Sequence, residues 1–141
     1  MAEFTAVALQ EVEPNQNILF TDEVVCGNNS IVHRGGSGLV TLRGITNQCR
    51  ARFKVTFGAN VAIPTGGTVG PISVAISLNG EPVASTTMIS TPTAVEAFNN
   101  ISSSIFIDVP CGCCSQVSVR NITVDTAISV QNANLIVERV A

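Results

Sequence analysis

Cys49-Arg-Ala-Arg-Phe-Lys-Val-Thr-Phe-Gly58 is the stretch of this sequence that decides the fold. Apolar residues occupy every second position from Ala51 to Phe57, and basic or hydroxyl residues occupy the positions between them. In an extended strand, this period of two places the apolar side chains on one face and the polar side chains on the other. A strand of this kind buries one face and leaves the other in water or beside acids, which is typical of an antiparallel sandwich.

Short alternating stretches separated by Gly, Pro and Asn turns predict further strands along the chain. Asn79-Gly80 has the typical sequence of a two-residue hairpin turn. The strict alternation after Asn100 outweighs the helix formers at residues 94–98, so one long strand is expected there. The further predicted strands are Ala2–Val12, Asn17–Phe20, Glu23–Cys26, Ile31–His33, Leu39–Leu42, Pro71–Leu78, Val83–Ser90, Ala94–Val109, Gln116–Val124, Ala127–Val130 and Leu135–Val140.

About ten strands without helical periodicity predict an all-β fold, an antiparallel jelly-roll sandwich. The whole chain, residues 1–141, is expected to form this single domain, in which residues 1–16 are an N-terminal strand or an attachment arm. An immunoglobulin sandwich is disfavoured because it needs a buried Trp, and the sequence has no Trp.

The composition points to a protein whose surface is partly covered by other subunits. Charged residues make up only 12% of the chain, against about 25% in ordinary soluble domains. The net charge of −3 argues against a nucleic-acid partner. No apolar run reaches the roughly 18 to 20 residues that cross a membrane, and the N-terminus lacks the basic region of a signal peptide. We therefore expect that the chain does not insert into a membrane and that it is made in the cytoplasm without a Sec signal.

Three of the five cysteines, Cys111, Cys113 and Cys114, form the sharpest chemical feature. A zinc site needs a second pair of ligands, which this chain lacks. Buried or free thiols, disulfides within or between subunits, and a metal held jointly by symmetry-related loops all remain open. Adjacent residues of an extended chain face opposite ways, so one of Cys113 and Cys114 is expected to serve the core and the other to reach a neighbour.

The other two cysteines, Cys26 and Cys49, flank predicted strand ends. We expect them to be small buried hydrophobic residues, with a disulfide across the sandwich as the alternative. The odd number of cysteines without a signal peptide fits a protein made in a reducing compartment, whose thiols cross-link later.

His33 is the only histidine, so a nucleophile–histidine arrangement would have to use it. The nucleophile-elbow and metal-hydrolase signatures are absent from the sequence, and the Gly-rich residues 35–38 lack the following helix of a phosphate-binding loop. Acids at strand ends and turns are usually solvated rather than the paired carboxylates of a glycosidase. The sequence thus predicts no catalytic residue, no metal, no cofactor and no enzyme activity. The acids considered for a glycosidase pair are Glu81, Glu96, Asp108 and Asp125.

The basic face of residues 49–58 carries Arg50, Arg52 and Lys54, three of the seven basic residues of the chain. Because so few basic residues exist, we expect them to pair with acids across strands or across a subunit interface rather than to bind nucleic acid. Glu138 is the acid expected to pair with them. These four residues are the predicted trimer contacts.

The order of four segments resembles the trimeric tumour-necrosis-factor-like and complement-like jelly rolls, in particular the C-terminal domain of BclA-type collagen-like spore-surface glycoproteins. These segments are Gly38–Leu42, Arg52–Phe57, Ile76–Val83 and Ala133–Ala141. The resemblance implies a tight homotrimer whose inner sheet faces a three-fold axis and which serves as the stable head of a surface assembly. Two departures are the few aromatic residues near Cys49 and Ala51, and the absence of a collagen Gly-X-Y tract.

The predicted function is structural: a self-assembling homotrimeric head that decorates or builds a larger particle, such as the spore surface layer (exosporium) or a phage capsid or fibre. Small residues near the C-terminus, Ala127, Ala133 and Ala141, are expected to allow close approach of subunits. The alternative is a carbohydrate- or receptor-binding head with glycans as partners. The absence of Trp and Tyr, the usual sugar-stacking residues, weighs against this alternative.

Overall fold

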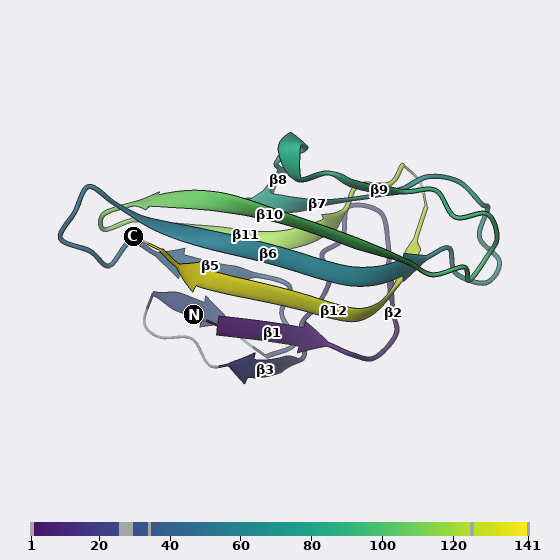
Figure 1. Cartoon of the computed structure of the whole chain (residues 1–141), viewed down its shortest axis with the longest axis horizontal. Coiled ribbons are helices and arrows are strands. Elements are labelled where there is room, and N and C mark those ends of the chain that lie inside the picture. Colours follow the sequence, from purple (N-terminus) through teal and green to yellow (C-terminus); the bar gives the residue numbers. More distant parts are fainter. Residues whose placement is uncertain (1, 26–29, 34, 125, 141) are drawn as a thin grey trace.

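The structure is a computed structural model that describes residues 2–25, 30–33, 35–124 and 126–140. Two antiparallel six-stranded sheets lie face to face and enclose one core (Figure 1). The expected antiparallel jelly-roll sandwich is therefore confirmed. In the part of the chain that the structure describes, no helix is long and apolar enough to cross a membrane.

The first sheet, called the long sheet here, has the order β10-β6-β12-β1-β3, with β2 beside β12. The second sheet, called the short sheet, has the order β4-β5-β11-β7-β8, with β9 beside β7. The strands of the long sheet are β1 Ala2–Ala6, β2 Gln10–Val12, β3 Asp22–Val25, β6 Arg50–Ala62, β10 Asn99–Pro110 and β12 Ile128–Arg139. Those of the short sheet are β4 Ile31–His33, β5 Val40–Arg43, β7 Ile72–Leu78, β8 Glu81–Pro82, β9 Met88–Ser90 and β11 Cys114–Asn121.

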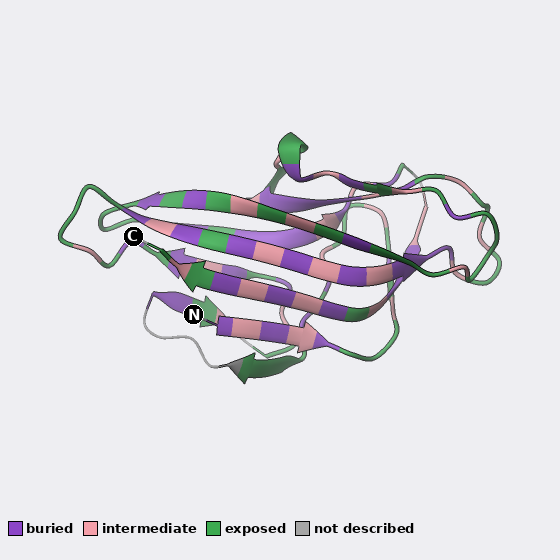
Figure 2. Ribbon diagram, viewed as in Figure 1, coloured by how far each residue is buried: buried purple, intermediate pink, exposed green. Residues whose placement is uncertain are grey.

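Strand β6 is the centre of the core, as its sequence predicts. Its burial alternates along the strand (Figure 2), and the side chains of Phe53, Val55 and Phe57 are fully buried. The ring of Phe20 lies edge-on to that of Phe57, with 6.3 Å between centroids. Aliphatic side chains from both sheets fill the remaining core. The long sheet is thus fixed to the short sheet by one face, and its other face is left to solvent.

The predicted hairpin turn is confirmed, but the strand after it is shorter than expected. Asn79 and Gly80 have φ angles of 52° and 88°, as the two central residues of a type I′ turn require. Residues 84–86 form a 3-10 turn between β8 and β9 instead of continuing a strand. The Thr86 hydroxyl explains this break, because it accepts from the Ile76 amide at 3.0 Å and donates to the Val83 carbonyl at 2.7 Å.

Five other predicted strands differ clearly from the observed ones. The predicted strand Ala2–Val12 is divided into β1 and β2, and residues 17–20 contribute only an isolated bridge at Asn17. Residues 94–98 precede β10 and include Glu96 at a φ of 63°. The last two predicted strands are one strand, β12, whose bulge between Gln131 and Asn134 shifts the alternation of buried residues. That shift made one strand look like two.

Candidate functional site

Strands β10, β6, β12 and β1 present one continuous face to solvent, called here the outer face of the long sheet. On β6 and β10 its centre is built from small, uncharged side chains, whereas β12 adds Ile136 opposite Thr56, and Asn134 donates to the Glu3 carboxylate of β1. Gly58 lies opposite Ser102 of β10 and Asn134 of β12 in the register of the strands. One row further on, the hydroxyls of Thr56 and Ser104 lie 3.2 Å apart. Small side chains on a continuous sheet make a flat surface that another subunit can approach closely.

Gly58 is the position on this surface that has no side chain. A Cβ placed on Gly58 would meet only the carbonyl oxygen of Ile101, at 3.9 Å. This is an ordinary van der Waals contact, and the φ of Gly58 is not in the left-handed region. The folded chain therefore does not itself need glycine here, although a tightly packed neighbour would.

Of the small alanines near the C-terminus, Ala133 does not lie on the outer face as expected. Ala133 is buried with 2% exposure and packs in the core, because the bulge in β12 turns it inward. Ala127 is half-buried at the start of β12, and Ala141 lies outside the described residues. The small residues of the outer face come instead from β6 and β10.

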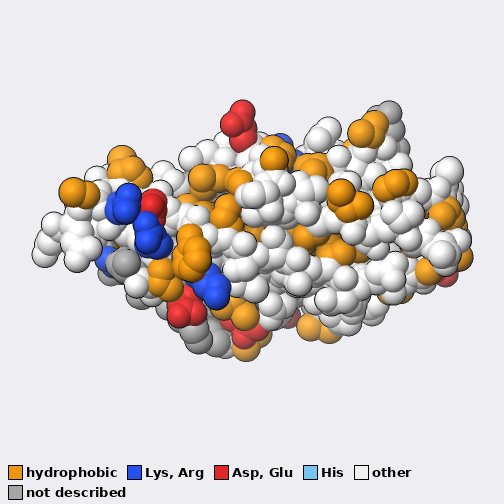
Figure 3. Space-filling view, turned by 45° about the horizontal axis from the view of Figure 1, so that its top comes forward, with side chains coloured by type: hydrophobic (Ala, Val, Ile, Leu, Met, Phe, Trp, Pro, Cys, Tyr) orange, Lys and Arg blue, Asp and Glu red, His pale blue; other side chains and the backbone are white. Residues whose placement is uncertain are grey.

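One end of the outer face is charged. Arg52 donates two hydrogen bonds to Asp108 of the neighbouring strand β10, at 2.8 and 3.2 Å, and Arg50 lies 3.5 Å from the same carboxylate. Figure 3 shows Lys and Arg side chains gathered near one end of the molecule, and most of the remaining view is uncharged, with hydrophobic side chains among the other surface atoms. Arg50, Arg52, Lys54 and Glu138, the four predicted trimer contacts, all lie on this face.

Within the chain, the ion-pair partner of Arg50 and Arg52 is Asp108, and the expected contact of Glu138 across a subunit interface stays a prediction. Glu138 lies opposite Lys54 in the register of β6 and β12. The hydrogen bond from Arg52 lowers the pKa of the Asp108 carboxyl below its ordinary value of 3.8; burial opposes this shift, and the charges of Arg50 and Arg52 add to it. The same hydrogen bond raises the pKa of Arg52.

Asp108→Asn is expected to remove a pH-dependent contribution to stability. Because the folded-state pKa is lowered, the ionised Asp108 stabilises the fold above the ordinary value of 3.8, and this contribution is lost as the pH falls through the lower folded value. The difference in Tm between wild type and variant should therefore be constant near neutral pH and shrink toward zero below 3.8. Thermal unfolding across this pH range measures it, with Glu81→Gln on the short sheet as control. An equal difference at every pH would contradict the ion-pair account.

The same end of the molecule carries four exposed thiols, called here the thiol end: Cys49, Cys111, Cys113 and Cys114. Cys49 and Cys111 flank the paired ends of β6 and β10, and their backbones share a hydrogen bond of 3.1 Å from the Cys111 amide to the Cys49 carbonyl. Cys113 closes the turn, and Cys114 begins β11. The sequence located three members of this cluster and missed Cys49, because the antiparallel pairing of β6 with β10 brings it there.

Two expectations about the cysteines are corrected. Neither Cys113 nor Cys114 faces the core, since both are exposed, and Cys49 is exposed rather than a small buried hydrophobic residue. Cys26, its proposed partner across the sandwich, lies outside the described residues. Among the residues that the structure describes, no group of three or more His, Cys, Asp or Glu is arranged to hold a metal ion.

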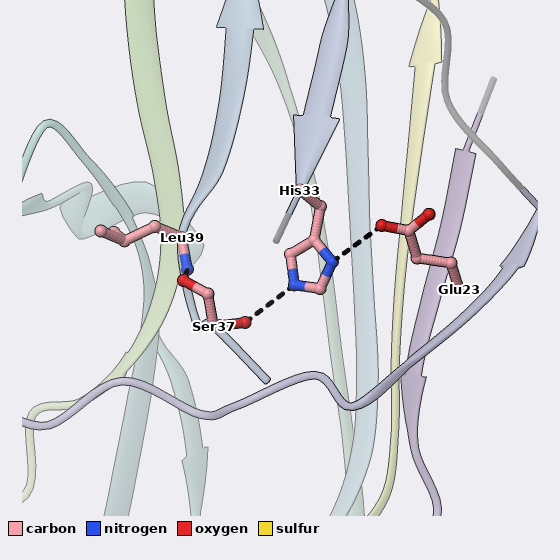
Figure 4. A network of polar contacts seen from close by, with 4 residues as sticks. All are labelled: Glu23, His33, Ser37 and Leu39. Carbon is pink, nitrogen blue, oxygen red and sulfur yellow. Dashed lines mark hydrogen bonds and ion pairs between the residues drawn. The ribbon is translucent and has the colours of Figure 1, made fainter. Parts of the chain in front are cut away.

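His33 has a buried side chain in a polar network that reaches the surface at Glu23 (Figure 4). Its side chain is 0% exposed and its ring lies 4.5 Å from that of Phe4. Nε2 lies 2.8 Å from the Ser37 carbonyl and Nδ1 lies 3.3 Å from Glu23. A carbonyl can only accept, so Nε2 carries a proton. The Ser37 hydroxyl instead accepts from the Leu39 amide, so no hydroxyl in this network is placed on the ring as a nucleophile.

His33→Ala is expected to destabilise the fold by about 2–3 kcal/mol, because it leaves the Ser37 carbonyl without its donor and opens a gap beside Phe4. Chemical denaturation measures the loss. His33→Gln, which can still donate one hydrogen bond, should recover part of it. If both variants were as stable as wild type, the network would have no structural role.

The three described acids among the four considered for a glycosidase pair are not brought together. Asp108 lies at the charged end of the outer face, whereas Glu81 is on β8 of the short sheet. Glu96 accepts a hydrogen bond from the Thr65 hydroxyl in the loops beyond the far end of β6. Asp125 lies outside the described residues.

The loops at that far end enclose two neighbouring hollows. One, of about 390 Å³, is lined by residues of the loops 68–71 and 122–126, including Thr68, Thr123 and Thr126. The other, of about 320 Å³, shares Thr68 and Thr126 and adds Glu11 and residues 64–67. Polar groups dominate the lining of the second hollow, whereas the first also has apolar side chains such as Val69, Ile122 and Val124. Neither lining contains an aromatic side chain.

Comparison with known proteins identifies the fold. No protein-family model matches the chain, and no curated protein matches its sequence. A tumour necrosis factor, Eiger from S. frugiperda, is 12% identical, with a TM-score of 0.69 over 99% of this chain and 91% of that one. The globular domain of zebrafish complement 1qA is 11% identical, with a TM-score of 0.63 over 96% of this chain and 94% of that one. Murine APRIL is 10% identical, with a TM-score of 0.58 over 92% and 96% of the two chains.

The chain has the TNF- and complement-like jelly-roll fold. The resemblance inferred from the order of its sequence segments is thereby confirmed. At 10% to 12% identity these likenesses extend to the fold. The surface of this jelly roll has to be interpreted from its own residues.

Proposed function

We propose that the chain is a structural, non-enzymatic head that assembles as a homotrimer through the outer face of the long sheet. The observation that carries this proposal is the uncharged, small-residue centre of that face on a TNF- and complement-like jelly roll. The Cβ space at Gly58 supports it, because a glycine that the folded chain does not need is explained by close contact with a neighbour. The resemblance inferred from the sequence implies a trimer whose inner sheet faces a three-fold axis, and in this proposal the long sheet is that inner sheet.

The charge distribution fits such an interface. Between the charged end and the far loops, the outward positions of β6 and β10 carry Thr, Gly, Ser and Asn. A subunit interface can cover these residues without removing a charge from water, which would otherwise cost several kcal/mol per ion. Arg50, Arg52 and Lys54, together with Glu138, border this region and supply polar contacts at its edge.

Within this proposal, the trimer builds or decorates the surface of a larger particle, a spore surface layer or a phage capsid or fibre. Its low charge and the exposed thiols Cys113 and Cys114, which can join neighbouring heads, support a place in a lasting assembly. In this proposal the chain is made in the cytoplasm, is incorporated into the particle as it assembles, and is displayed on the surface of the finished particle.

The proposed location is tested on particles purified from the source by density gradient. Mass spectrometry of the intact particles should find the chain, and brief protease treatment of their surface should remove its exposed tryptic peptides. Recovery of the chain solely from the soluble cell fraction would contradict a particle role. That result would contradict the particle role alone, and the oligomeric state would still be measured separately.

The second candidate is a carbohydrate-binding head, favoured by the two hydroxyl-lined hollows at the far loops. Thr68 and Thr126 line both hollows and are suited to hydrogen bonds with sugar hydroxyls. A glycan array distinguishes the candidates: a reproducible hit that is lost in Thr126→Val would support sugar binding. No hit at high micromolar protein would leave the structural role alone.

A further inference from the structure

Cys49 lies just before β6 and Cys111 just after β10, at the same end of the ladder that these two strands form. Arg50, the first residue of β6, is the register partner of Pro110, the last residue of β10. One step beyond this pair, the Cys111 amide donates to the Cys49 carbonyl at 3.1 Å. The ladder therefore continues past its assigned ends, and Cys49 and Cys111 occupy its final, directly opposite positions.

Directly opposite positions suit a disulfide. A hydrogen-bonded antiparallel pair has Cα atoms about 5.5 Å apart, and disulfides most often join Cα atoms about 5.5 to 6 Å apart. Because side chains alternate along each strand, the side chains of Cys49 and Cys111 lie on the same side of the sheet. Cys113 and Cys114 are less suited to bond to each other, since neighbouring residues of an extended chain project apart.

The backbone around this pair is already held in place. The Gly44 amide donates to the Cys113 carbonyl at 2.9 Å, and the Gly112 amide donates to the Gly44 carbonyl at 3.1 Å. A Cβ on Gly44 would lie 2.1 Å from the Pro110 carbonyl oxygen, so this loop is pressed tightly against the turn. The Cys111 thiol donates to the Thr46 carbonyl at 2.9 Å. Rotation of this side chain away from Thr46 is the main movement that bonding to Cys49 requires.

We propose that Cys49 and Cys111 form an intrachain disulfide once the protein leaves a reducing compartment. This bond closes the open end of the β6–β10 ladder and leaves Cys113 and Cys114 as the thiols available to neighbouring molecules. The proposal does not depend on the trimer or on a particle role, since it rests on the register of two strands within one chain.

The oxidant is a low-molecular-weight disulfide such as glutathione disulfide. The deprotonated thiol of one cysteine attacks a sulfur of this compound, forms a mixed disulfide and expels one glutathione thiolate. The thiolate of the other cysteine then attacks the protein sulfur of the mixed disulfide and expels the second glutathione thiolate. The two protons released by the cysteines are taken up by the two glutathione thiolates. Two protein thiols and one glutathione disulfide thus give one protein disulfide and two glutathione thiols.

The charges near the pair favour this class of oxidant. Arg50 directly follows Cys49, and Arg43 lies opposite Cys114 in the register of β5 and β11. Glutathione disulfide is an anion at neutral pH, so basic residues next to the thiols attract it. Asp108 is the acid nearest to them along β10, and it is paired with both Arg52 and Arg50.

The test maps the disulfides of the full chain after equilibration with reduced and oxidised glutathione at low micromolar protein. Free thiols are blocked with N-ethylmaleimide, and trypsin digestion without reduction is followed by mass spectrometry. Peptide 44–50 carries Cys49, and peptide 55–120 carries Cys111, Cys113 and Cys114. These two peptides should be recovered joined, both from wild type and from the double variant Cys113→Ser/Cys114→Ser. Cys111→Ser should abolish the link.

A stability measurement accompanies the map. Oxidation of the double variant should raise Tm by about 5–15 °C, whereas Cys111→Ser should show no such rise. Circular dichroism establishes that each variant is folded. The proposal is overturned if Cys49 of the folded, oxidised double variant is fully alkylated. It is equally overturned if the link persists in Cys111→Ser, or if peptide 44–50 is found joined to the peptide that carries Cys26.

Discussion

Gly58→Arg is expected to convert the proposed trimer into a folded monomer. The substitution places a long charged side chain at the centre of the outer face of the long sheet, opposite Ser102 and Asn134. The chain itself tolerates a Cβ there, since only the Ile101 carbonyl lies nearby, at 3.9 Å. In the trimer, three arginines would be forced into an interface without partners, at a cost of several kcal/mol each. We expect the dissociation constant to rise by more than about a hundredfold.

Two further variants control this prediction. Gly58→Ala adds only the Cβ and tests how closely the neighbour packs, so it should weaken the trimer less than the arginine does. Gln116→Arg introduces the same charge at an exposed position of β11, on the short sheet, and should leave the trimer intact. Circular dichroism and Tm at a concentration where wild type is dissociated show whether each monomer is folded. A Gly58→Arg variant that remains trimeric would place the interface elsewhere.

Phe57→Ala is expected to produce the largest loss of stability in the folded chain, about 3–5 kcal/mol. Phe57 is fully buried at the centre of β6, and its ring lies 6.3 Å from that of Phe20. With no Trp or Tyr in the chain, no larger ring is available nearby to fill the space. A loss of this size approaches the whole stability of a marginal domain, which is about 5–15 kcal/mol.

Denaturant titration of the wild type and of Phe57→Ala measures this loss of stability. Phe98→Ala serves as the matched control, because that ring is 43% exposed and its removal should cost only about 1 kcal/mol. Equal losses in the two variants would mean that β6 is not the centre of the core.

The fold was predictable because the local sequence of β6 is enough to assign its structure. The alternation from Ala51 to Phe57 assigns both faces of the strand without reference to the rest of the chain, and Asn79-Gly80 does the same for the hairpin. The errors arose where a side chain or a bulge overrides the local pattern. The Thr86 hydroxyl replaces a strand partner, and the bulge before Asn134 shifts the alternation of β12.

The site was less predictable because it depends on pairing between distant strands. The basic stripe of β6 was found from its own sequence, but its partner Asp108 lies 56 residues from Arg52 and becomes visible only in the register of β6 with β10. The same pairing brings Cys49 beside Cys111. A search for oppositely charged or paired residues at matched distances from the ends of the two long alternating stretches would have indicated both.

Sedimentation equilibrium of the reduced wild-type chain, from nanomolar to high micromolar concentration, tests the central claim that this jelly roll is a self-assembling head. The account predicts a single species of three times the chain mass at micromolar concentration, with dissociation only on strong dilution. A well-folded monomer at high micromolar concentration would contradict it.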